Sequence, residues 1–179
     1  MKATGIVRRI DDLGRVVIPK EIRRTMRIRE GDPLEIYTTR EGEVIFKKYS
    51  LIGGLEDFAA QFCDVLNRSS GFTAAVTDRD AIIAITASGK RELLGKPLSD
   101  VLAQVMEQRS IYQYQGSGRP LPVSDSSDRY TVAVAAPILC EGDVLGLVLF
   151  LSSDAQIPGE GEYKLAQTVS AFLGRHMET

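Results

Sequence analysis

The sequence contains few of the side chains that enzymes and metalloproteins use for chemistry. Its 179 residues include no tryptophan, two cysteines and one histidine, His176. One imidazole leaves almost nothing from which to build a histidine metal cluster or a Ser/His triad. Cys63 and Cys140 suit neither a disulfide framework nor a zinc site, and we expect both to act as small core side chains. No metal and no cofactor is therefore expected.

Long hydrophobic runs are also missing. No segment approaches the ~20 consecutive apolar residues of a membrane-spanning helix. The N-terminus lacks the apolar core of a signal peptide. We therefore expect a soluble, cytoplasmic protein with no membrane partner.

Two pairs of carboxylates are the candidates for acid–base catalysis, Asp78 with Asp80 and Asp125 with Asp128. Each pair lies in an expected turn, where aspartate is common because its side chain bonds to the nearby backbone. The glycine-rich segments at 116–118 and 159–161 lack the Gly-Lys-Ser/Thr sequence of a phosphate loop. We therefore expect that the protein is not an enzyme.

The positive charge is concentrated at the N-terminus. Residues 1–50 contain 12 Lys and Arg against 8 Asp and Glu, a net charge of +4, whereas residues 51–179 contain 10 against 16, a net charge of −6. Within residues 1–29 the balance is 9 against 3. This asymmetry suggests a basic binding head joined to an acidic body, and the alternative is an ordinary solvated surface.

A short basic helix is predicted at the start of this head, because Pro19 is suited to a first helical turn. The spacing i, i+3, i+4, i+7 places four cations on one helical face: Lys20, Arg23, Arg24 and Arg27. Like charges at this spacing repel one another. A nucleic acid lying along the face would turn that repulsion into attraction.

Strands are expected on both sides of the helix. Residues 5–10 and 15–18 are predicted to be strands around a turn at 11–14. Residues 34–39 and 44–49 alternate as a hairpin, with Gly42 in its turn. The order β-β-α-β-β in about 50 residues is too small for a comfortable core, so we expect the head to dimerise.

The most specific pattern in the head is the run Asp11-Asp12-Leu13-Gly14-Arg15-Val16-Val17-Ile18-Pro19. With its flanks it resembles the N-terminal DNA-binding domain of the AbrB transition-state regulators, and the resemblance extends from Met1 to about Ser50. It implies a swapped-hairpin barrel, in which two chains interlace their strands. It also implies DNA contacts at the positions of Arg8, Arg15, Arg23 and Arg24. Arg9 stands where the family has Arg or Lys, while Lys20 and Arg27 would add supporting charge.

Each of these cations also has a structural interpretation. Arg8 could pair with Asp11 or Asp12, and Arg15 could be a solvated turn residue. Arg23 and Arg24 could pair with acidic neighbours, namely Glu21, Glu30 or Glu35. The apolar residues of the head are expected in a core or a dimer interface: Val7, Val16, Val17, Ile18, Ile22, Met26, Leu34, Ile36, Ile45 and Phe46.

A Gly53-Gly54 pair suggests a joint, which gives an N-terminal domain at 1–50, a linker at 51–55 and a second domain at 56–179. The second domain begins with apolar residues at 4-3-4 spacing: Leu55, Ala59, Phe62 and Leu66. This spacing fits either an inter-chain bundle or a helix packed on its own domain.

The second domain is predicted to have the order α-β-β-α-loop-β-β-α. Further helices are expected at 90–94, 101–107 and 160–177, and strands at 72–77, 81–86, 130–139 and 144–151. Ser99 or Asp100 can cap the second of these helices. Residues 108–128 are rich in Ser, Gly, Pro and Asp and are predicted to be an irregular loop. Three tyrosines border it and would line a ligand pocket or lie on the surface: Tyr112, Tyr114 and Tyr130.

Two segments of this domain, Gly95-Lys96-Pro97-Leu98-Ser99 and Gly142-Asp143-Val144-Leu145-Gly146-Leu147-Val148, resemble GAF domains. These are small-molecule sensory modules with a central antiparallel sheet. The expected fold class is α+β, with an N-terminal AbrB-like swapped-hairpin β-barrel dimer joined to a C-terminal GAF-like α/β domain. This tandem resembles developmental transcription regulators of spore-forming bacteria, which implies a homotetramer.

We therefore predict a sequence-dependent regulator that binds double-stranded DNA at promoters, associates with the nucleoid and acts as activator and repressor of sporulation-stage genes. The GAF-like domain would drive oligomerisation or bind an unidentified small-molecule effector. The alternative function is an antitoxin-like DNA-binding module that binds a protein toxin. Such proteins pair the head with a disordered tail, whereas residues 51–179 are predicted to fold.

Overall fold

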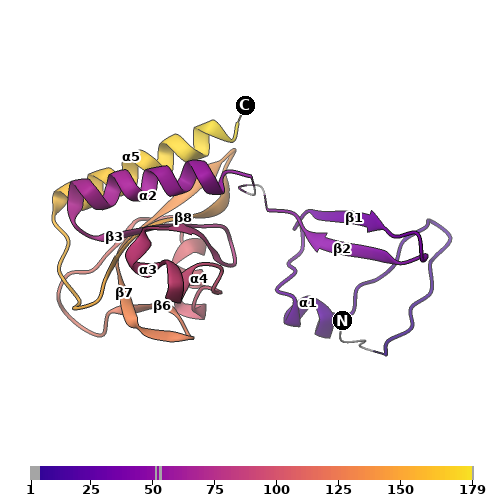
Figure 1. The fold of residues 1–179 in the computed structure, drawn as a ribbon. Helices are drawn as coiled ribbons and strands as arrows, with labels where there is room; N and C mark the ends of the chain where they lie inside the picture. The colour runs from indigo at the N-terminus through magenta and orange to yellow at the C-terminus, as the bar shows by residue number, and fades with distance from the viewer. Residues whose placement is uncertain (1–4, 51, 53, 179) are drawn as a thin grey trace. The chain divides into compact units, whose positions relative to one another are not determined.

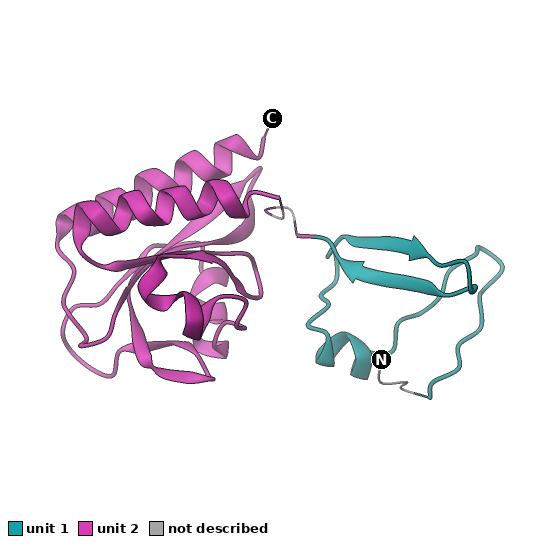
Figure 2. Cartoon of the chain, in the orientation of Figure 1, with its two compact units in different colours: residues 1–49 teal, residues 50–179 magenta. Residues whose placement is uncertain are grey.

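The computed structural model describes residues 5–50, 52 and 54–178 of the chain. The chain divides into two compact units, Met1–Tyr49 (unit 1) and Ser50–Thr179 (unit 2), coloured teal and magenta in Figure 2. Ile52, in the segment expected to be a linker, is buried in the core of unit 2. Leu51 and Gly53 of the same segment lie outside the described residues.

Unit 1 contains the expected antiparallel hairpin, made of β1 (Leu34–Thr38) and β2 (Val44–Lys48). In its turn the Gly42 N–H donates to the Thr39 carbonyl at 3.2 Å. Gly42 has a φ of 85°, a left-handed conformation that glycine adopts without a side-chain clash. The hairpin and its turn residue were therefore predicted correctly.

The basic helix α1 (Lys20–Thr25) is shorter than predicted, with Pro19 immediately before it. Arg27 has a φ of 52°, and the Ile28 N–H donates to the Arg23 carbonyl at 2.8 Å. A left-handed residue followed by this hydrogen bond is a Schellman ending, which stops a helix. The expectation that Arg27 shares a helical face with Arg23 is therefore wrong, because Arg27 lies beyond the helix.

Residues 5–10 and 15–18 form no strand within the chain, so the prediction of two strands there is wrong for a single chain. The turn between them is present: the Gly14 N–H donates to the Asp11 carbonyl at 3.1 Å. An extended segment becomes a strand only when a neighbouring segment pairs with its backbone. The hairpin β1–β2 pairs with itself and does not supply that partner.

Unit 1 exposes much of the apolar surface that was expected to form a core or an interface. Val7 is 90% exposed, Val17 67% and Ile36 61%. Large apolar side chains of a folded domain are usually buried, and a contiguous exposed apolar patch marks an interaction surface. The remaining large apolar residues exposed in unit 1 are Ile6, Ile10, Leu13, Val16, Met26, Tyr37, Val44, Phe46 and Tyr49.

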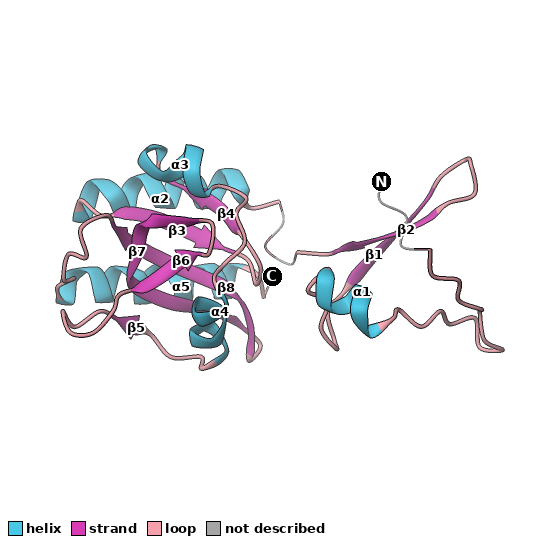
Figure 3. Cartoon of the chain, turned by 90° about the horizontal axis from the view of Figure 1, so that it is seen from below, coloured by secondary structure: helices cyan, strands magenta, loops and turns pink. Residues whose placement is uncertain are grey.

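Unit 2 is built on a six-stranded antiparallel sheet in the order β4-β3-β8-β7-β5, with β6 also paired to β7 (Figure 3). Its two long central strands, β7 and β8, account for the strongest apolar runs of the sequence. The strands are β3 (Thr73–Thr77), β4 (Ile82–Ile85), β5 (Tyr112–Gln113), β6 (Leu121–Ser124), β7 (Ser127–Cys140) and β8 (Asp143–Ser152).

Helices cover both faces of this sheet. α2 (Glu56–Ser70) and α5 (Glu160–His176) lie side by side on one face (Figure 1), and α3 (Ala87–Leu93) and α4 (Asp100–Glu107) pack on the other. The expected cap of α4 is present, because the Leu102 N–H donates to the Ser99 hydroxyl at 3.1 Å.

Side chains of each central strand alternate between the two cores. Val148 and Phe150 of β8 point into the core under α2 and α5, whereas Leu147, Leu149 and Leu151 join the core under α3 and α4. This period of two is the ordinary consequence of a pleated strand. Strands buried on both faces therefore give nearly continuous apolar sequences.

The segment at 108–128 is more ordered than predicted, because β5, β6 and the start of β7 lie within it. Tyr114 and Tyr130 are buried, and the Tyr130 hydroxyl donates to the Ser88 carbonyl at 3.0 Å. These two tyrosines are core residues, so the alternative that they lie on the loop surface is wrong, whereas the ligand-pocket alternative stays a prediction.

Candidate nucleic-acid interface

The seven candidate DNA-binding residues are all exposed and come from three consecutive parts of unit 1. Arg8 and Arg9 lie in the extended N-terminal segment, and Arg15 follows the turn at 11–14. The other candidates belong to α1 or follow it: Lys20, Arg23, Arg24 and Arg27. The described part of unit 1 therefore presents these cations to solvent.

Five of these cations have no carboxylate partner in the described part of the chain. Among residues 5–50, 52 and 54–178, no ion pair is found for Arg8, Arg9, Lys20, Arg23 or Arg24. In the described residues, Arg23 and Arg24 therefore form no ion pair with the acidic neighbours that were considered as partners. Their guanidinium groups can bind a phosphate without first breaking an internal ion pair.

Arg15 is held differently, by the carboxylate of Asp11. The Asp11 Oδ2 accepts from the Arg15 Nε at 2.8 Å, and the Asp11 Oδ1 accepts from the Arg15 backbone N–H at 2.7 Å. The Leu13 N–H donates to the same Oδ1 at 3.0 Å. The carboxylate therefore fixes both the turn and the base of the arginine side chain.

These hydrogen bonds favour the ionised form of the carboxyl group. They hold the pKa of Asp11 below its ordinary value of 3.8, with the Arg15 backbone N–H as the largest cause and the Arg15 guanidinium next. Hydrogen bonds and an opposite charge both stabilise a carboxylate in this way. Asp11 is thus charged and bound to Arg15 at neutral pH.

Asp11 is the residue of this site whose role the sequence analysis missed. Asp11 was considered only as a possible partner of Arg8, whereas the structure pairs it with Arg15. The available signal was an acidic residue four positions before an arginine, across a turn that contains Gly14. Such a spacing lets an aspartate bond both to the turn backbone and to the arginine.

Unit 2 carries a second exposed surface, on the outer side of α2 and α5. Phe58 packs against Phe62 at a ring-centroid distance of 5.0 Å and stacks on His176 at 5.2 Å. Phe172 lies 5.5 Å from Phe62 and is 48% exposed. We call these residues, together with the exposed Val65, the aromatic face. An apolar patch across two neighbouring helices is typical of a helix–helix interface.

Metal and membrane features are not found in the described part of the chain. Its His, Cys, Asp and Glu residues form no group of three or more that could hold a metal ion. None of its helices is long and apolar enough to span a bilayer. The candidate catalytic residue Asp78 instead stabilises its own turn, since its Oδ1 accepts from the Asp80 and Ala81 N–H groups at 2.8 Å each.

Comparisons with known proteins agree with both halves of this architecture. Residues 54–178 match the family model described as stage V sporulation protein T C-terminal, transcription factor. Residues 7–51 match the model described as antidote-toxin recognition MazE, bacterial antitoxin. The stage V sporulation protein T of Bacillus subtilis (strain 168) is 50% identical over 181 residues, which cover 99% of each chain.

The N-terminal unit has a further relative of higher identity. The transition state regulatory protein AbrB of Bacillus subtilis (strain 168) is 63% identical over 49 residues, which are 27% of this chain and 50% of AbrB. The solution structure of the N-terminal DNA recognition domain of that regulator covers 27% of this chain and 91% of its own, with a TM-score of 0.24.

The fold of unit 2 also has a solved counterpart. The GAF domain/HD domain protein from Geobacter sulfurreducens is 18% identical, covers 73% of this chain and 99% of its own, and has a TM-score of 0.50. At this identity the likeness concerns the fold alone. The expected α+β class, with an AbrB-like unit followed by a GAF-like antiparallel sheet, is confirmed.

Fold and comparisons together define a class, that of transcription factors with an AbrB-like N-terminal domain and a GAF-like C-terminal domain. Both the family model over residues 54–178 and the full-length relative identify the member of this class. The chain belongs to the stage V sporulation protein T family.

Proposed function

We propose that this transcription factor binds double-stranded promoter DNA through the basic surface of unit 1, and acts as both activator and repressor of sporulation-stage genes. The observation that carries this proposal is a set of seven exposed cations within a segment 63% identical to AbrB, five of which have no ion pair among the described residues. Arg8, Arg15, Arg23 and Arg24 are the main contacts, and the supporting cations are Arg9, Lys20 and Arg27.

The proposed contacts divide into two kinds. Arg23 and Arg24 lie on α1 and form no ion pair among the described residues. Their guanidinium groups can therefore bind phosphates from several directions. Arg15 is fixed by Asp11 through its Nε, which leaves its terminal nitrogens to contact DNA. A pre-oriented guanidinium loses less side-chain entropy on binding, and its fork matches the acceptor pair of guanine in the major groove.

We further propose that two copies of unit 1 complete each other. Residues 5–10 and 15–18 lack a strand partner among the described residues, and exposed apolar side chains lie both in these segments, as at Val7 and Val17, and on the hairpin, as at Ile36. Strands from a second chain would satisfy both needs in a swapped-hairpin barrel. The twofold symmetry of such a dimer would also double the cationic surface.

The aromatic face of unit 2 is proposed as a second interface between chains. Burying Phe172 and Val65 against a second copy of α2 and α5 would form a four-helix contact. With dimers at both units, four chains can assemble into a homotetramer that holds two DNA-binding heads together. Tethering of this kind raises the effective concentration of the second head at the DNA.

Fluorescence anisotropy with labelled promoter DNA tests the proposal. Arg15→Ala and the double variant Arg23→Ala/Arg24→Ala are expected to bind at least about tenfold more weakly than the unmodified chain. The matched control is Arg119→Ala, an exposed arginine of unit 2, which should bind DNA normally. Equal binding by all four proteins, with circular dichroism showing that they are folded, would reject the assigned surface.

The salt dependence provides a second test of the same surface. About 6–8 phosphate contacts per dimer should give a log–log slope of affinity against salt of about −5 to −7. The double variant removes contacts from both chains and should have a shallower slope. An affinity that stays flat from low to moderate salt would contradict an electrostatic mechanism.

The match of residues 7–51 to an antitoxin model supports a second candidate function, a DNA-binding module that also binds a protein toxin. A toxin-binding tail is typically disordered before it binds. Residues 54–178 instead contain a six-stranded sheet with a core on each face. Resistance of this unit to limited proteolysis would favour the regulator, whereas rapid digestion to the head alone would favour the antitoxin.

A further inference from the structure

The helix that carries Arg23 and Arg24 is held only weakly by packing within unit 1. None of the residues of α1 is buried. Among residues 5–50, no backbone hydrogen bond joins α1 to β1 or β2. In Figure 1, α1 lies below the hairpin and leads into β1 through residues 26–33. The orientation of the helix therefore depends on how this connection is fixed.

The connection begins with a strained residue. Arg27 has a φ of 52°, a left-handed conformation that is unfavourable for a residue with a side chain. Glycine usually occupies the position that ends a helix in this way. A residue of another type keeps such a conformation only where its surroundings hold it there. The contacts around Arg27 must therefore offset the cost of the turn.

The ammonium group of Lys48, at the end of β2, supplies one of these contacts. The Lys48 Nζ donates to the Arg27 carbonyl at 2.9 Å. A cation that binds a carbonyl at the C-terminal end of a helix also complements the negative end of the helix dipole. Lys48 thus connects the end of α1 to the second strand of the hairpin.

The carboxylate of Asp32 holds the next part of the connection. Its Oδ2 accepts from the Arg29 N–H at 2.8 Å, and the Asp32 N–H donates to the Arg29 carbonyl at 3.2 Å. The same Oδ2 lies 3.7 Å from the Lys48 Nζ. The two charged groups therefore contact each other and bind backbone groups on both sides of Ile28. We call this arrangement the Asp32–Lys48 clamp.

The turn that the clamp holds is bonded to the backbone of both arginines of α1. The Arg27 N–H donates to the Arg24 carbonyl at 3.2 Å, and the Ile28 N–H donates to the Arg23 carbonyl at 2.8 Å. Both arginines lie in the last turn of the helix. A change in the turn at Arg27 is therefore transmitted directly to the residues that are proposed to contact DNA.

We propose that Asp32 and Lys48 are positioning residues, which orient Arg23 and Arg24 toward DNA without contacting it themselves. The proposal rests on the DNA-binding function proposed above for α1. Lys48 acts through the Arg27 carbonyl, so its removal loosens the end of the helix. Side chains on a loosened helix lose more conformational entropy when they bind, and DNA binding weakens.

The first test compares two neighbouring lysines by fluorescence anisotropy with labelled promoter DNA. Lys48→Met should bind about fivefold more weakly than the unmodified full-length chain, and Lys48→Arg, which keeps the charge and the donor, should restore most of the affinity. The matched control is Lys47→Met. Lys47 is exposed, points to the opposite face of the strand and lies with its Nζ 4.8 Å from the centre of the Tyr37 ring. The control variant loses the same charge and should bind nearly as well as the unmodified chain.

Asp32→Ala separates positioning from charge. Removing a carboxylate from a surface that binds a polyanion strengthens binding if charge alone matters. We expect Asp32→Ala instead to bind about fivefold more weakly, because the Arg29 N–H loses its acceptor. Glu30→Ala removes the same charge from an exposed position in the same connection, and its affinity should be equal or higher.

A double-mutant cycle shows whether the clamp acts through α1. Binding is measured at low salt, where the weakened variants still bind DNA. Adding Lys48→Met to Arg23→Ala/Arg24→Ala should cause little further loss, because the arginines that the clamp orients are absent. Amide hydrogen exchange by NMR should also be faster at the Ile28 N–H in Lys48→Met than in Lys47→Met. Circular dichroism checks the folding of each variant, and Asp32→Ala carries the same cycle if Lys48→Met does not fold.

The outcomes distinguish this proposal from the proposed function. The clamp is rejected as a positioning device if Lys48→Met and Lys47→Met bind alike, if Asp32→Ala binds more tightly, or if the losses are additive in the combined variant. Each of these results leaves the DNA-binding surface intact. Normal binding by Arg23→Ala/Arg24→Ala would instead reject that surface, and this proposal with it.

Discussion

The carboxylate of Asp11 binds Arg15 at two points, through the side-chain Nε at 2.8 Å and the backbone N–H at 2.7 Å. The side chain of Arg15 nevertheless stays 69% exposed. An exposed arginine without a partner would sample many rotamers, and its ordering on DNA would oppose binding. The pair therefore points one guanidinium outward from a turn whose shape the same carboxylate fixes.

The titration of Asp11 should report this pair directly. Because its pKa is depressed in the folded chain, the interaction is fully present above pH 3.8 and is lost as pH falls through the lower folded value. Carboxyl-carbon NMR of the folded chain should show Asp11 titrating below 3.8. In Arg15→Ala the pKa should rise toward 3.8 but not reach it, because residue 15 keeps its backbone N–H donor. A wild-type pKa at or above 3.8 would contradict the pairing.

Asp11→Ala should weaken DNA binding although it removes a negative charge from a surface that binds a polyanion. The expected loss is about fivefold, the equivalent of one net hydrogen bond, and anisotropy with promoter DNA measures it. The matched control is Asp12→Ala, which removes the same charge beside the turn and should leave the affinity equal or higher. Tighter binding by both variants would show that Asp11 acts only as a repelling charge.

In the proposed assembly, Phe172→Asp should reduce the mass from that of a tetramer to that of a dimer, because a carboxylate cannot be buried in a helix–helix contact without a partner. Native mass spectrometry measures the change. Val101→Asp on α4 is the control, since Val101 is 45% exposed and Phe172 48%. If the masses of both variants equal that of the unmodified chain, the aromatic face is not an interface.

Alanine substitutions at two glycines of α5 should change the free energy of unfolding in opposite directions. Gly174→Ala should lower the free energy of unfolding by about 1–3 kcal/mol, because its Cβ would meet the Leu139 carbonyl. At Gly161 a Cβ has no atom within 4 Å, so Gly161→Ala should raise the stability by up to about 1 kcal/mol. Urea unfolding followed by circular dichroism at a fixed chain concentration compares them. Equal effects would mean that α5 and β7 are further apart than described.

The buried thiol of Cys63 should make the chain less stable in alkali. Burial raises its pKa to about 12, from an ordinary value of 9.0. Above pH 9.0 the unfolded thiol ionises while the folded thiol does not, so stability falls between pH 9.0 and about 12. The expected slope is on the order of 1 kcal/mol per pH unit. Cys63→Ala should remove this slope, and an unchanged slope would contradict the prediction.

The elements that the sequence predicted correctly are those whose signal is local. Gly42 marks the β1–β2 turn, Ser99 caps α4, and β8 is a continuous apolar run buried on both faces. The two short strands β5 and β6 were missed, since a two-residue strand and a strand that contains Pro122 have no pattern of their own. They form because β7 pairs with them.

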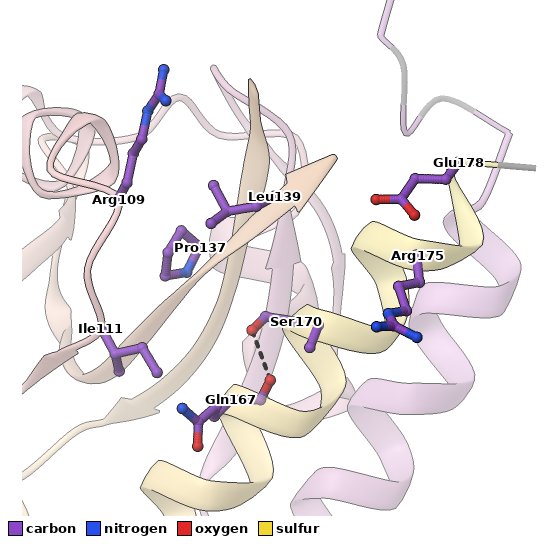
Figure 4. Close-up of a pocket in the computed structure, with 9 residues that line it drawn as sticks. Arg109, Ile111, Pro137, Leu139, Gln167, Ser170, Arg175 and Glu178 are labelled. Carbon is purple, nitrogen blue, oxygen red and sulfur yellow. Dashed lines mark hydrogen bonds between the residues drawn. The ribbon is translucent and has the colours of Figure 1, made fainter. Parts of the chain in front are cut away.

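The candidate sites divide in a similar way. The cations of unit 1 are visible in the sequence because Arg23 and Arg24 belong to one contiguous motif. The role of Asp11 depends on which arginine its carboxylate meets, and this is decided by the geometry of the turn. The pocket lined by Ile111, Pro137 and Ser170 (Figure 4) has no sequence signal, because these residues come from three separate parts of the chain.

Unit 1 leaves apolar side chains exposed, and Val7 is 90% exposed. The stability of unit 1 should therefore depend on the concentration of the chain. Under the proposed pairing, the finished head is a product of two chains, so its abundance rises with the square of their concentration at low expression. Each tenfold rise in chain concentration stabilises the paired form by about 1.4 kcal/mol. The occupancy of a promoter bound by this protein would therefore rise more steeply than in proportion to the rate at which the protein is synthesised.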